Sequence, residues 1–161
     1  MSDQSAVPKS VTASTETGPS GPAVRLNPKT SACYVCGPEN PAGLHVRFEP
    51  HGAQGARAAY TVLKEHCGWP GILHGGVAFA LMDEALAWAC YFQGLYGVTA
   101  RVETRFRQPL PVGAKLVIQA WTANRRKRVV SARAEIRLDS EEGAVVAEAD
   151  ATMYLPEKGS D

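Results

Sequence analysis

A long apolar stretch in the middle of the chain restricts its fold more than any other feature of the sequence. Residues 74–92, HGGVAFALMDEALAWACYF, are apolar on nearly every face of a helix, yet Asp83 and Glu84 stand near their middle. A helix that is hydrophobic all round is normally buried in a protein core. A carboxylate in such a place is costly unless it is paired, reached by solvent or used in chemistry. The sequence therefore predicts a buried central helix with two candidate functional groups.

The length and charge of the chain exclude several classes of protein. Its 161 residues are enough for one domain with a sizeable core. The net charge is +1 and no apolar run reaches the roughly 20 residues that span a bilayer, so we expect neither a nucleic-acid partner nor a membrane partner. The first residues include Asp3 and Glu16 and lack the pattern of a secretory signal or transit peptide, which predicts a cytoplasmic protein.

Composition divides the chain into a domain with a tail at each end. Residues 1–27 are rich in Ser, Thr, Pro and Gly and have no apolar periodicity, which predicts a disordered tail. We expect the folded domain to cover residues 28–156 and a short C-terminal tail to cover residues 157–161.

Period-two alternation of apolar residues predicts strands on both sides of the helix. The expected strands cover residues 44–49, 56–63, 98–106, 115–123, 130–138 and 145–155. The short links between them favour antiparallel neighbours. We therefore predict an α+β fold in which a six-stranded antiparallel sheet wraps around one long central helix. Such a sheet leaves an all-apolar helix incompletely covered, so a second copy of the chain is the expected partner.

Two glycines, Gly75 and Gly76, stand where the helix is expected to begin. The first backbone N–H groups of a helix have no partner within it and lie at the positive end of its dipole, so they can stabilise an oxyanion. The alternative is that both glycines only relieve crowding between helix and sheet. His74, just before them, either donates to a substrate or caps the helix. His66 either orients a water or substrate or lies on a surface loop.

Asp83 follows Gly75 by eight residues, which is roughly 12 Å along a helix. A carboxylate that attacks a carbonyl, or activates water for it, must lie within about 3–4 Å of the reacting group. One chain therefore cannot supply both residues to one carbonyl, whereas two antiparallel helices in a dimer can. The alternative is that Asp83 and Glu84 pair with arginines that follow the helix, namely Arg101, Arg105 and Arg107.

Two further clusters are open to more than one interpretation. The run Asn124–Arg128 is either a solvated turn or a site for a phosphate-bearing substrate. Cys33 and Cys36 form a Cys-x-x-Cys pair, which His66 and Cys67 could complete as a zinc site. The second pair lacks the spacing of a zinc finger or ribbon, so free thiols in a tight turn, without metal, are the favoured interpretation.

Several motifs resemble those of one enzyme family. The sequence HGGVAFALMDEA, the lead-in CYVCGPENPAGLHVRF, the loop GWPGILHGG and the strand FRQPLPVG lie within roughly residues 33–155. They are similar to the hotdog-fold acyl-CoA thioesterases of the phenylacetate-pathway type, within the 4-hydroxybenzoyl-CoA thioesterase superfamily. This resemblance implies hydrolysis of an acyl-CoA to a carboxylic acid and free coenzyme A, without a metal or redox cofactor, by a homodimer or a dimer of dimers.

The resemblance also implies roles for individual residues. Gly75 is the residue whose N–H polarises the thioester carbonyl, and Asp83 is the nucleophile or general base. Thr99 positions the attacking water, although the alternation places it on the polar face of its strand. From its own position before the helix, and not from the resemblance, His74 completes the expected catalytic set. The expected substrate-binding residues are Gly76, His66 and Glu84, from their positions in the chain, and Arg125, Arg126 and Arg128, from the resemblance. The arginines are expected to contact the nucleotide end of coenzyme A.

One position departs from the family pattern and leaves other functions to be weighed. Many relatives carry Asn or Gln six residues before the histidine, where this chain has Gly68. Loss of that polar side chain favours a non-catalytic acyl-CoA-binding protein as the first alternative. A hydratase or dehydratase using His74 with Glu84, and a zinc-stabilised interaction domain, are the others. The aromatic residues of the helix do not identify the acyl group.

Overall fold

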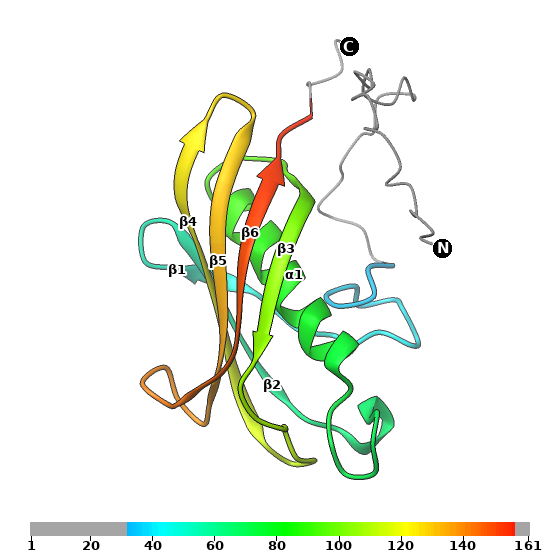
Figure 1. Cartoon of the computed structure of the whole chain (residues 1–161). Coiled ribbons are helices and arrows are strands. Elements are labelled where there is room, and N and C mark those ends of the chain that lie inside the picture. Colours follow the sequence, from blue (N-terminus) through cyan, green and yellow to red (C-terminus); the bar gives the residue numbers. More distant parts are fainter. Residues whose placement is uncertain (1–31, 157–161) are drawn as a thin grey trace, which may run out of the picture.

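One long helix lies across a face of a six-stranded antiparallel sheet (Figure 1). The computed structural model describes residues 32–156, so the tails predicted at 1–27 and 157–161 lie outside the described residues. Along the chain the elements are β1 (Glu49–His51), β2 (Gly55–Thr61), the short 3-10 helix η1 (Lys64–His66), α1 (Gly75–Tyr91), β3 (Val98–Phe106), β4 (Lys115–Arg126), β5 (Val129–Leu138) and β6 (Val145–Tyr154). The strand order in the sheet is β1-β2-β4-β5-β6-β3. The predicted α+β fold, with six strands and one central helix, is confirmed.

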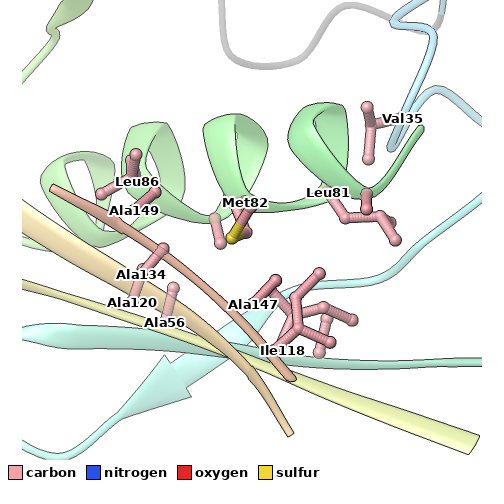
Figure 2. Packing of buried hydrophobic residues seen from close by; sticks show 14 of the residues in the cluster. Val35, Ala56, Leu81, Met82, Leu86, Ile118, Ala120, Ala134, Ala147 and Ala149 are labelled. Atoms are coloured by element: carbon pink, nitrogen blue, oxygen red, sulfur yellow. The ribbon is translucent and has the colours of Figure 1, made fainter. Parts of the chain in front are cut away.

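The core lies between α1 and the face of the sheet that it covers. Leu81, Met82 and Leu86 are completely buried and lie on the side of α1 that faces the sheet (Figure 2). Opposite them the strands present several alanines, such as Ala120 and Ala134, and these small side chains let the helix pack close to the sheet. Burying each large apolar side chain stabilises the fold by about 1.5–3 kcal/mol. The helix is therefore held to the sheet mainly by apolar burial.

α1 is not buried on every side, as expected for an apolar helix that one sheet covers incompletely. Phe79 is 37% exposed, and Asp83, Glu84 and Trp88 are half-buried. Both carboxylates therefore escape full burial. Among residues 32–156, no helix is both long and apolar enough to cross a membrane.

The first predicted strand is wrong over most of its length. The segment expected at 44–49 enters the sheet only at Glu49. Its earlier residues hydrogen-bond to the N-terminal turn instead, as where the Leu44 N–H donates to the Tyr34 carbonyl at 2.8 Å. The turn thus satisfies backbone groups that a neighbouring strand would otherwise bind.

The basic run at 124–128 is mostly strand and not a turn as expected. β4 continues to Arg126, so a two-residue turn, Lys127–Arg128, leads into β5. Lys127 adopts a φ of 55°, the left-handed conformation that lets so short a turn match the twist of both strands. Arg125 and Arg126 therefore belong to the end of β4.

A bulge at the start of β3 changes the face that Thr99 occupies. The register with β6 shifts between Thr99 and Arg101, so Ala100 is the extra residue. An inserted residue reverses the alternation of side chains on one side of it. The Thr99 side chain therefore contacts α1, and its assignment to the polar face by simple alternation is wrong.

Candidate functional site

α1 begins at a capped N-terminus. His74 is the N-cap, with φ −63° and ψ 132°, and its Nδ1 accepts a hydrogen bond from the Gly76 N–H at 2.8 Å. Nδ1 must carry a lone pair to accept this bond, so the neutral ring is protonated at Nε2. The structure thus shows the capping role of His74. Its Nε2–H has no partner within residues 32–156 and remains available to a ligand.

Gly75 is the first helical residue and presents an unused backbone donor. Within residues 32–156 its N–H has no hydrogen-bond acceptor, whereas the next N–H is taken by His74. Gly75 is exposed, and the nearest heavy atom to an added Cβ would be Phe106 Cζ, at 3.9 Å. Relief of crowding therefore does not account for this glycine. An exposed donor at the positive end of the helix dipole is suited to binding a carbonyl oxygen or an oxyanion.

Gly76 and Gly68, by contrast, leave room for the His74 ring. A Cβ added at Gly76 would lie 2.9 Å from His74 Nδ1, and one added at Gly68 would lie 3.0 Å from His74 Cδ2. Gly68 replaces the Asn or Gln of the family pattern at a point where a longer side chain would displace this ring. The absence of a side chain at both glycines therefore allows the His74 ring to take its capping position.

Replacing Gly76 by alanine is expected to displace the His74 ring and break the cap. Loss of an N-cap hydrogen bond costs about 0.5–2 kcal/mol, and alanine recovers part of this through its helix propensity. Gly75→Ala adds the same methyl group one residue earlier without a clash. We expect the free energy of unfolding of Gly76→Ala to be about 1 kcal/mol below that of Gly75→Ala, measured by urea denaturation. Equal values would show that the cap does not stabilise the fold.

Asp83 faces the start of β3. Its Oδ1 accepts a hydrogen bond from the Thr99 hydroxyl at 2.6 Å, a contact that depends on the bulge in β3. Thr99 Oγ1 also lies 3.7 Å from Met153 Sδ, on β6. Within the described residues no Lys or Arg pairs with Asp83, so a neutral group orients its carboxylate. The ion pairs considered from the sequence, with Arg101, Arg105 or Arg107, do not form there.

Glu84 contacts the N-terminal segment and not β3. Its Oε1 accepts a hydrogen bond from Trp88 Nε1–H at 3.0 Å, and its Oε2 lies 3.5 Å from Cys33 Sγ. Burial, together with the Glu84 carboxylate, raises the pKa of the Cys36 thiol above its usual value. The two adjacent carboxylates therefore belong to separate clusters. Sequence reasoning missed Trp88 as a partner, although its i, i+4 spacing from Glu84 is the one that brings helical side chains together.

His66, in η1, forms a hydrogen bond with the residue that caps α1. Its carbonyl accepts the His74 N–H at 2.9 Å, and its Nδ1 shares a hydrogen bond with the Tyr60 hydroxyl. The rings of Tyr60 and His66 are stacked with centroids 6.0 Å apart. Burial raises the pKa of the Tyr60 hydroxyl, so this group stays neutral near pH 7. Sequence reasoning missed Tyr60, because nothing in the pattern of β2 indicated a contact with the following loop.

The basic residues form the tip of the β4–β5 hairpin. Arg126, Lys127 and Arg128 line an open pocket of about 820 Å³ there. Arg128 Nη1 donates to the Tyr154 hydroxyl of β6 at 3.0 Å, and Tyr154 in turn pairs with the first residue of β3. The tip of the β4–β5 hairpin and the start of β3 lie at the same end of the sheet (Figure 1). Because Asp83 contacts Thr99 at the start of β3, it lies toward the same end as the basic residues.

The predicted site residues fall into separate groups along α1. His74–Gly76 form the first turn of the helix with His66 behind them, while Asp83 and Thr99 meet farther along. Roughly 12 Å of helix axis separates these two groups, which is too far for both to act on one carbonyl. Glu84 joins neither group.

Comparison with protein families supports the resemblance seen in the sequence. Residues 70–145 match the model of the Thioesterase superfamily. The matched segment contains α1, β3, β4 and β5, and hence both groups of candidate residues on the helix. No curated protein matches the chain in sequence.

Solved structures extend the likeness to most of the described chain. A crystal structure of a thioesterase superfamily protein has a TM-score of 0.71 and 27% identity, over 78% of this chain and 60% of that one. The PaaI protein from the phenylacetic acid degradation operon of E. coli has a TM-score of 0.64 and 25% identity, over 70% and 80% of the two chains. A hypothetical thioesterase from Streptococcus pneumoniae TIGR4, solved with coenzyme A, has a TM-score of 0.64 and 21% identity, over 71% and 88%, and shows likeness of fold alone. This chain thus spans 60% of the length of the first of these proteins.

Proposed function

We propose that this chain, a hotdog-fold member of the thioesterase superfamily, hydrolyses an acyl-CoA thioester to a carboxylic acid and free coenzyme A. The predicted hotdog fold and the resemblance to the phenylacetate-pathway family are confirmed. The observation that carries the proposed reaction is the Asp83 carboxylate, which is half-buried, oriented by the Thr99 hydroxyl and free of any Lys or Arg partner among residues 32–156. A carboxylate held in this way can act on a thioester or on water.

In the proposed reaction the Gly75 N–H donates to the thioester oxygen and stabilises the negative charge that develops there. Asp83 either removes a proton from the attacking water or attacks the carbonyl carbon itself, in which case water then cleaves the mixed anhydride. With water as the nucleophile, a C–O bond forms as the C–S bond breaks, and the coenzyme A thiolate takes up the proton that Asp83 removed. With Asp83 as the nucleophile, the thiolate leaves first, and hydrolysis of the anhydride then restores the Asp83 carboxylate and releases the proton. Thr99 keeps the carboxylate in one orientation through its 2.6 Å hydrogen bond.

The reaction requires two copies of the chain, because Gly75 and Asp83 lie roughly 12 Å apart along α1. β3 offers an edge for the second copy, since among residues 32–156 this nine-residue strand pairs with β6 and with no other strand. An edge of this length is prone to pair with another strand. In the proposed dimer, the two β3 strands pair antiparallel about a twofold axis near Val102. Thr99 of each copy then lies opposite the Phe106 end of the other copy's strand. Phe106 lies beside Gly75, so each site would combine Gly75 of one copy with Asp83 of the other.

Exposed apolar side chains on β3 and α1 favour the same pairing. Val98 and Phe106 of β3 are 38% and 52% exposed, and Phe79 of α1 is 37% exposed. Exposed apolar groups that gather in one region often mark a contact with another protein chain. We therefore propose a homodimer, or a dimer of dimers built from it, with two equivalent sites.

The coenzyme A portion of the substrate is proposed to bind at the basic hairpin tip. Arg125, Arg126 and Lys127 are exposed there, and such side chains bind phosphate groups strongly. The hairpin stands at the end of the sheet that carries Asp83. The Streptococcus pneumoniae protein of the same fold was solved with coenzyme A, which supports this class of ligand.

Among the alternative functions, the geometry favours acyl-CoA binding without cleavage and disfavours a hydratase or dehydratase. Gly68 offers no polar side chain to hold a water, which favours a protein that binds an acyl-CoA without cleaving it. A hydratase or dehydratase would need His74 and Glu84 together, but His74 caps α1 and Glu84 contacts Cys33. Acyl-CoA binding without turnover is therefore the second candidate.

A panel of acyl-CoA substrates tests the proposed function directly. Short, long and aromatic acyl-CoAs are incubated with the purified chain, and released thiol is measured with a disulfide reagent. The chain has four free cysteines, so the reaction of the reagent with protein alone is subtracted. We expect at least one acyl class to be turned over at about 1 s⁻¹ or faster, as is typical of enzymes. Tight binding by calorimetry without thiol release would identify the second candidate.

A further inference from the structure

A second cluster of reactive groups lies outside the proposed catalytic site. The Sγ atoms of Cys33 and Cys36 and a carboxylate oxygen of Glu84 all lie within 4.8 Å of one another, and all three residues are half-buried. They come from two parts of the chain: a turn in which the Gly37 N–H donates to the Cys33 carbonyl at 3.0 Å, and the middle of α1. In the part of the chain that the structure describes, no other group of three or more His, Cys, Asp or Glu ligand atoms converges in this way.

The separation of Cys33 Sγ and Glu84 Oε2 matches tetrahedral zinc coordination. With Zn–S and Zn–O bonds of about 2.3 and 2.1 Å, a tetrahedral angle sets the sulfur and oxygen ligands about 3.6 Å apart. Cys33 Sγ and Glu84 Oε2 are 3.5 Å apart. A Cys-x-x-Cys spacing is also a usual source of two zinc ligands. Cys33 and Glu84 are therefore already spaced as two ligands of one zinc ion, and the Cys36 sulfur lies within 4.8 Å of both.

The Glu84 carboxylate is held in place by its neighbours. Trp88 Nε1–H donates to Oε1 at 3.0 Å, which leaves Oε2 as the oxygen near the sulfur of Cys33. Trp88 is itself fixed by aromatic packing, with ring centroids 6.3 Å from Phe48 and 5.2 Å from Phe92. Hydrogen bonds from outside the ligand set orient metal-binding carboxylates in the same manner. The carboxylate is thus preorganised to accept a cation.

The cluster also lacks a positive side chain to balance it. Among residues 32–156, Glu84 has no Lys or Arg partner. A carboxylate and two thiols gathered in a half-buried place are stabilised by a cation, because burial disfavours an uncompensated negative charge. Thiolate ligands select zinc over hard ions such as magnesium.

We propose that Cys33, Cys36 and Glu84 bind one zinc ion whose fourth position is open to water. The ion would join the N-terminal turn to α1. This ligand set differs from the one considered from the sequence, because neither His66 nor Cys67 belongs to the cluster.

Metal analysis of the full-length chain tests this proposal. The protein is purified under reducing conditions without an affinity tag, and its zinc content is measured by mass spectrometry of the elements. We expect about one zinc ion per chain. Replacement of zinc by cobalt is expected to produce the charge-transfer absorption of a cobalt–thiolate bond. That signal reports on the ligands without the need for a variant.

Three substitutions, which differ in how directly they change the zinc ligands, test the proposed ligand set. Cys36→Ser removes a ligand and is expected to weaken zinc binding by about 100-fold or more. Trp88→Phe removes the hydrogen bond to Glu84 together with part of the ring that packs against Phe48 and Phe92, and is expected to weaken binding by about 10- to 100-fold. Cys67→Ser makes the same chemical change at a cysteine outside the cluster and is expected to keep the wild-type zinc content.

Several results would overturn the proposal. The first is a wild-type chain that takes up no zinc after incubation with zinc and reductant. The second is equal zinc content in wild type and Cys36→Ser, or an equal loss in Cys67→Ser. A Cys33–Cys36 disulfide in freshly isolated protein, detected by mass spectrometry, would assign the pair to redox chemistry instead. Asp83→Asn is expected to keep its zinc, so this readout is independent of hydrolysis.

Discussion

Replacing Asp83 by asparagine is expected to lower kcat for acyl-CoA hydrolysis by about 10²- to 10⁴-fold. Asparagine has nearly the same shape, and its side-chain oxygen can accept the hydrogen bond that the Thr99 hydroxyl donates at 2.6 Å. It lacks the negative charge that attack on a carbonyl, or removal of a proton from water, requires. KM is expected to change little, because Asp83 acts on the reacting atoms and not on the coenzyme A portion. Steady-state thiol release measures both constants.

Asp139→Asn provides a matched control for this change. Asp139 is exposed in the turn between β5 and β6, and its φ of 62° is a conformation that asparagine tolerates as well as aspartate. Its turnover is expected to equal that of the wild type. If Asp83→Asn were as active as this control, Asp83 would have no part in the reaction. A loss of activity accompanied by a lower Tm would indicate damage to the fold instead.

Much of the fold is determined by local patterns that the sequence displays. The period-two alternation after the helix predicts strands whose limits lie close to those of β3, β5 and β6, and Gly75 marks the first residue of α1. Gly94, with φ 71°, follows the helix where a terminating glycine is expected. These features can be predicted because strand faces and helix ends depend on residues only a few positions apart.

The exceptions depend on contacts between distant parts of the chain. The bulge at Ala100 has no motif of its own, yet it places the Thr99 hydroxyl on Asp83. Glu84 and Cys33 are 51 residues apart in the sequence, and no spacing rule connects them. The different surroundings of Asp83 and Glu84 therefore emerge only when the N-terminal turn and β3 pack against different residues of the helix.

Replacing Gly75 by proline is expected to lower kcat by about 10²- to 10³-fold with little loss of stability. Proline has no N–H, so this variant removes the donor proposed to stabilise the oxyanion. The first position of a helix accommodates proline, and His74 before it has the φ of −63° and ψ of 132° that residues before proline adopt. No hydrogen bond among residues 32–156 is lost, because none uses the Gly75 N–H. Thiol release and thermal unfolding measure the two effects.

Gly75→Ala separates loss of the donor from addition of bulk. Alanine keeps the N–H, and its Cβ would lie 3.9 Å from Phe106 Cζ, an ordinary contact distance. The loss of activity is expected to be much smaller than with proline. Equal losses in the two variants would mean that the site excludes any side chain at this position, and the N–H would then need no catalytic role.

A mixture of the two weakly active variants tests whether Gly75 and Asp83 act across two copies of the chain. Gly75→Pro and Asp83→Asn chains, co-expressed in equal amounts, would assemble at random, so about half of the dimers contain one chain of each kind. Each hybrid dimer has one site with both groups intact and one site with neither, because every site takes Gly75 from one copy and Asp83 from the other. About a quarter of the wild-type activity is therefore expected to return. If both groups acted within a single chain, no hybrid would contain an intact site, and the mixture would stay as inactive as its parents.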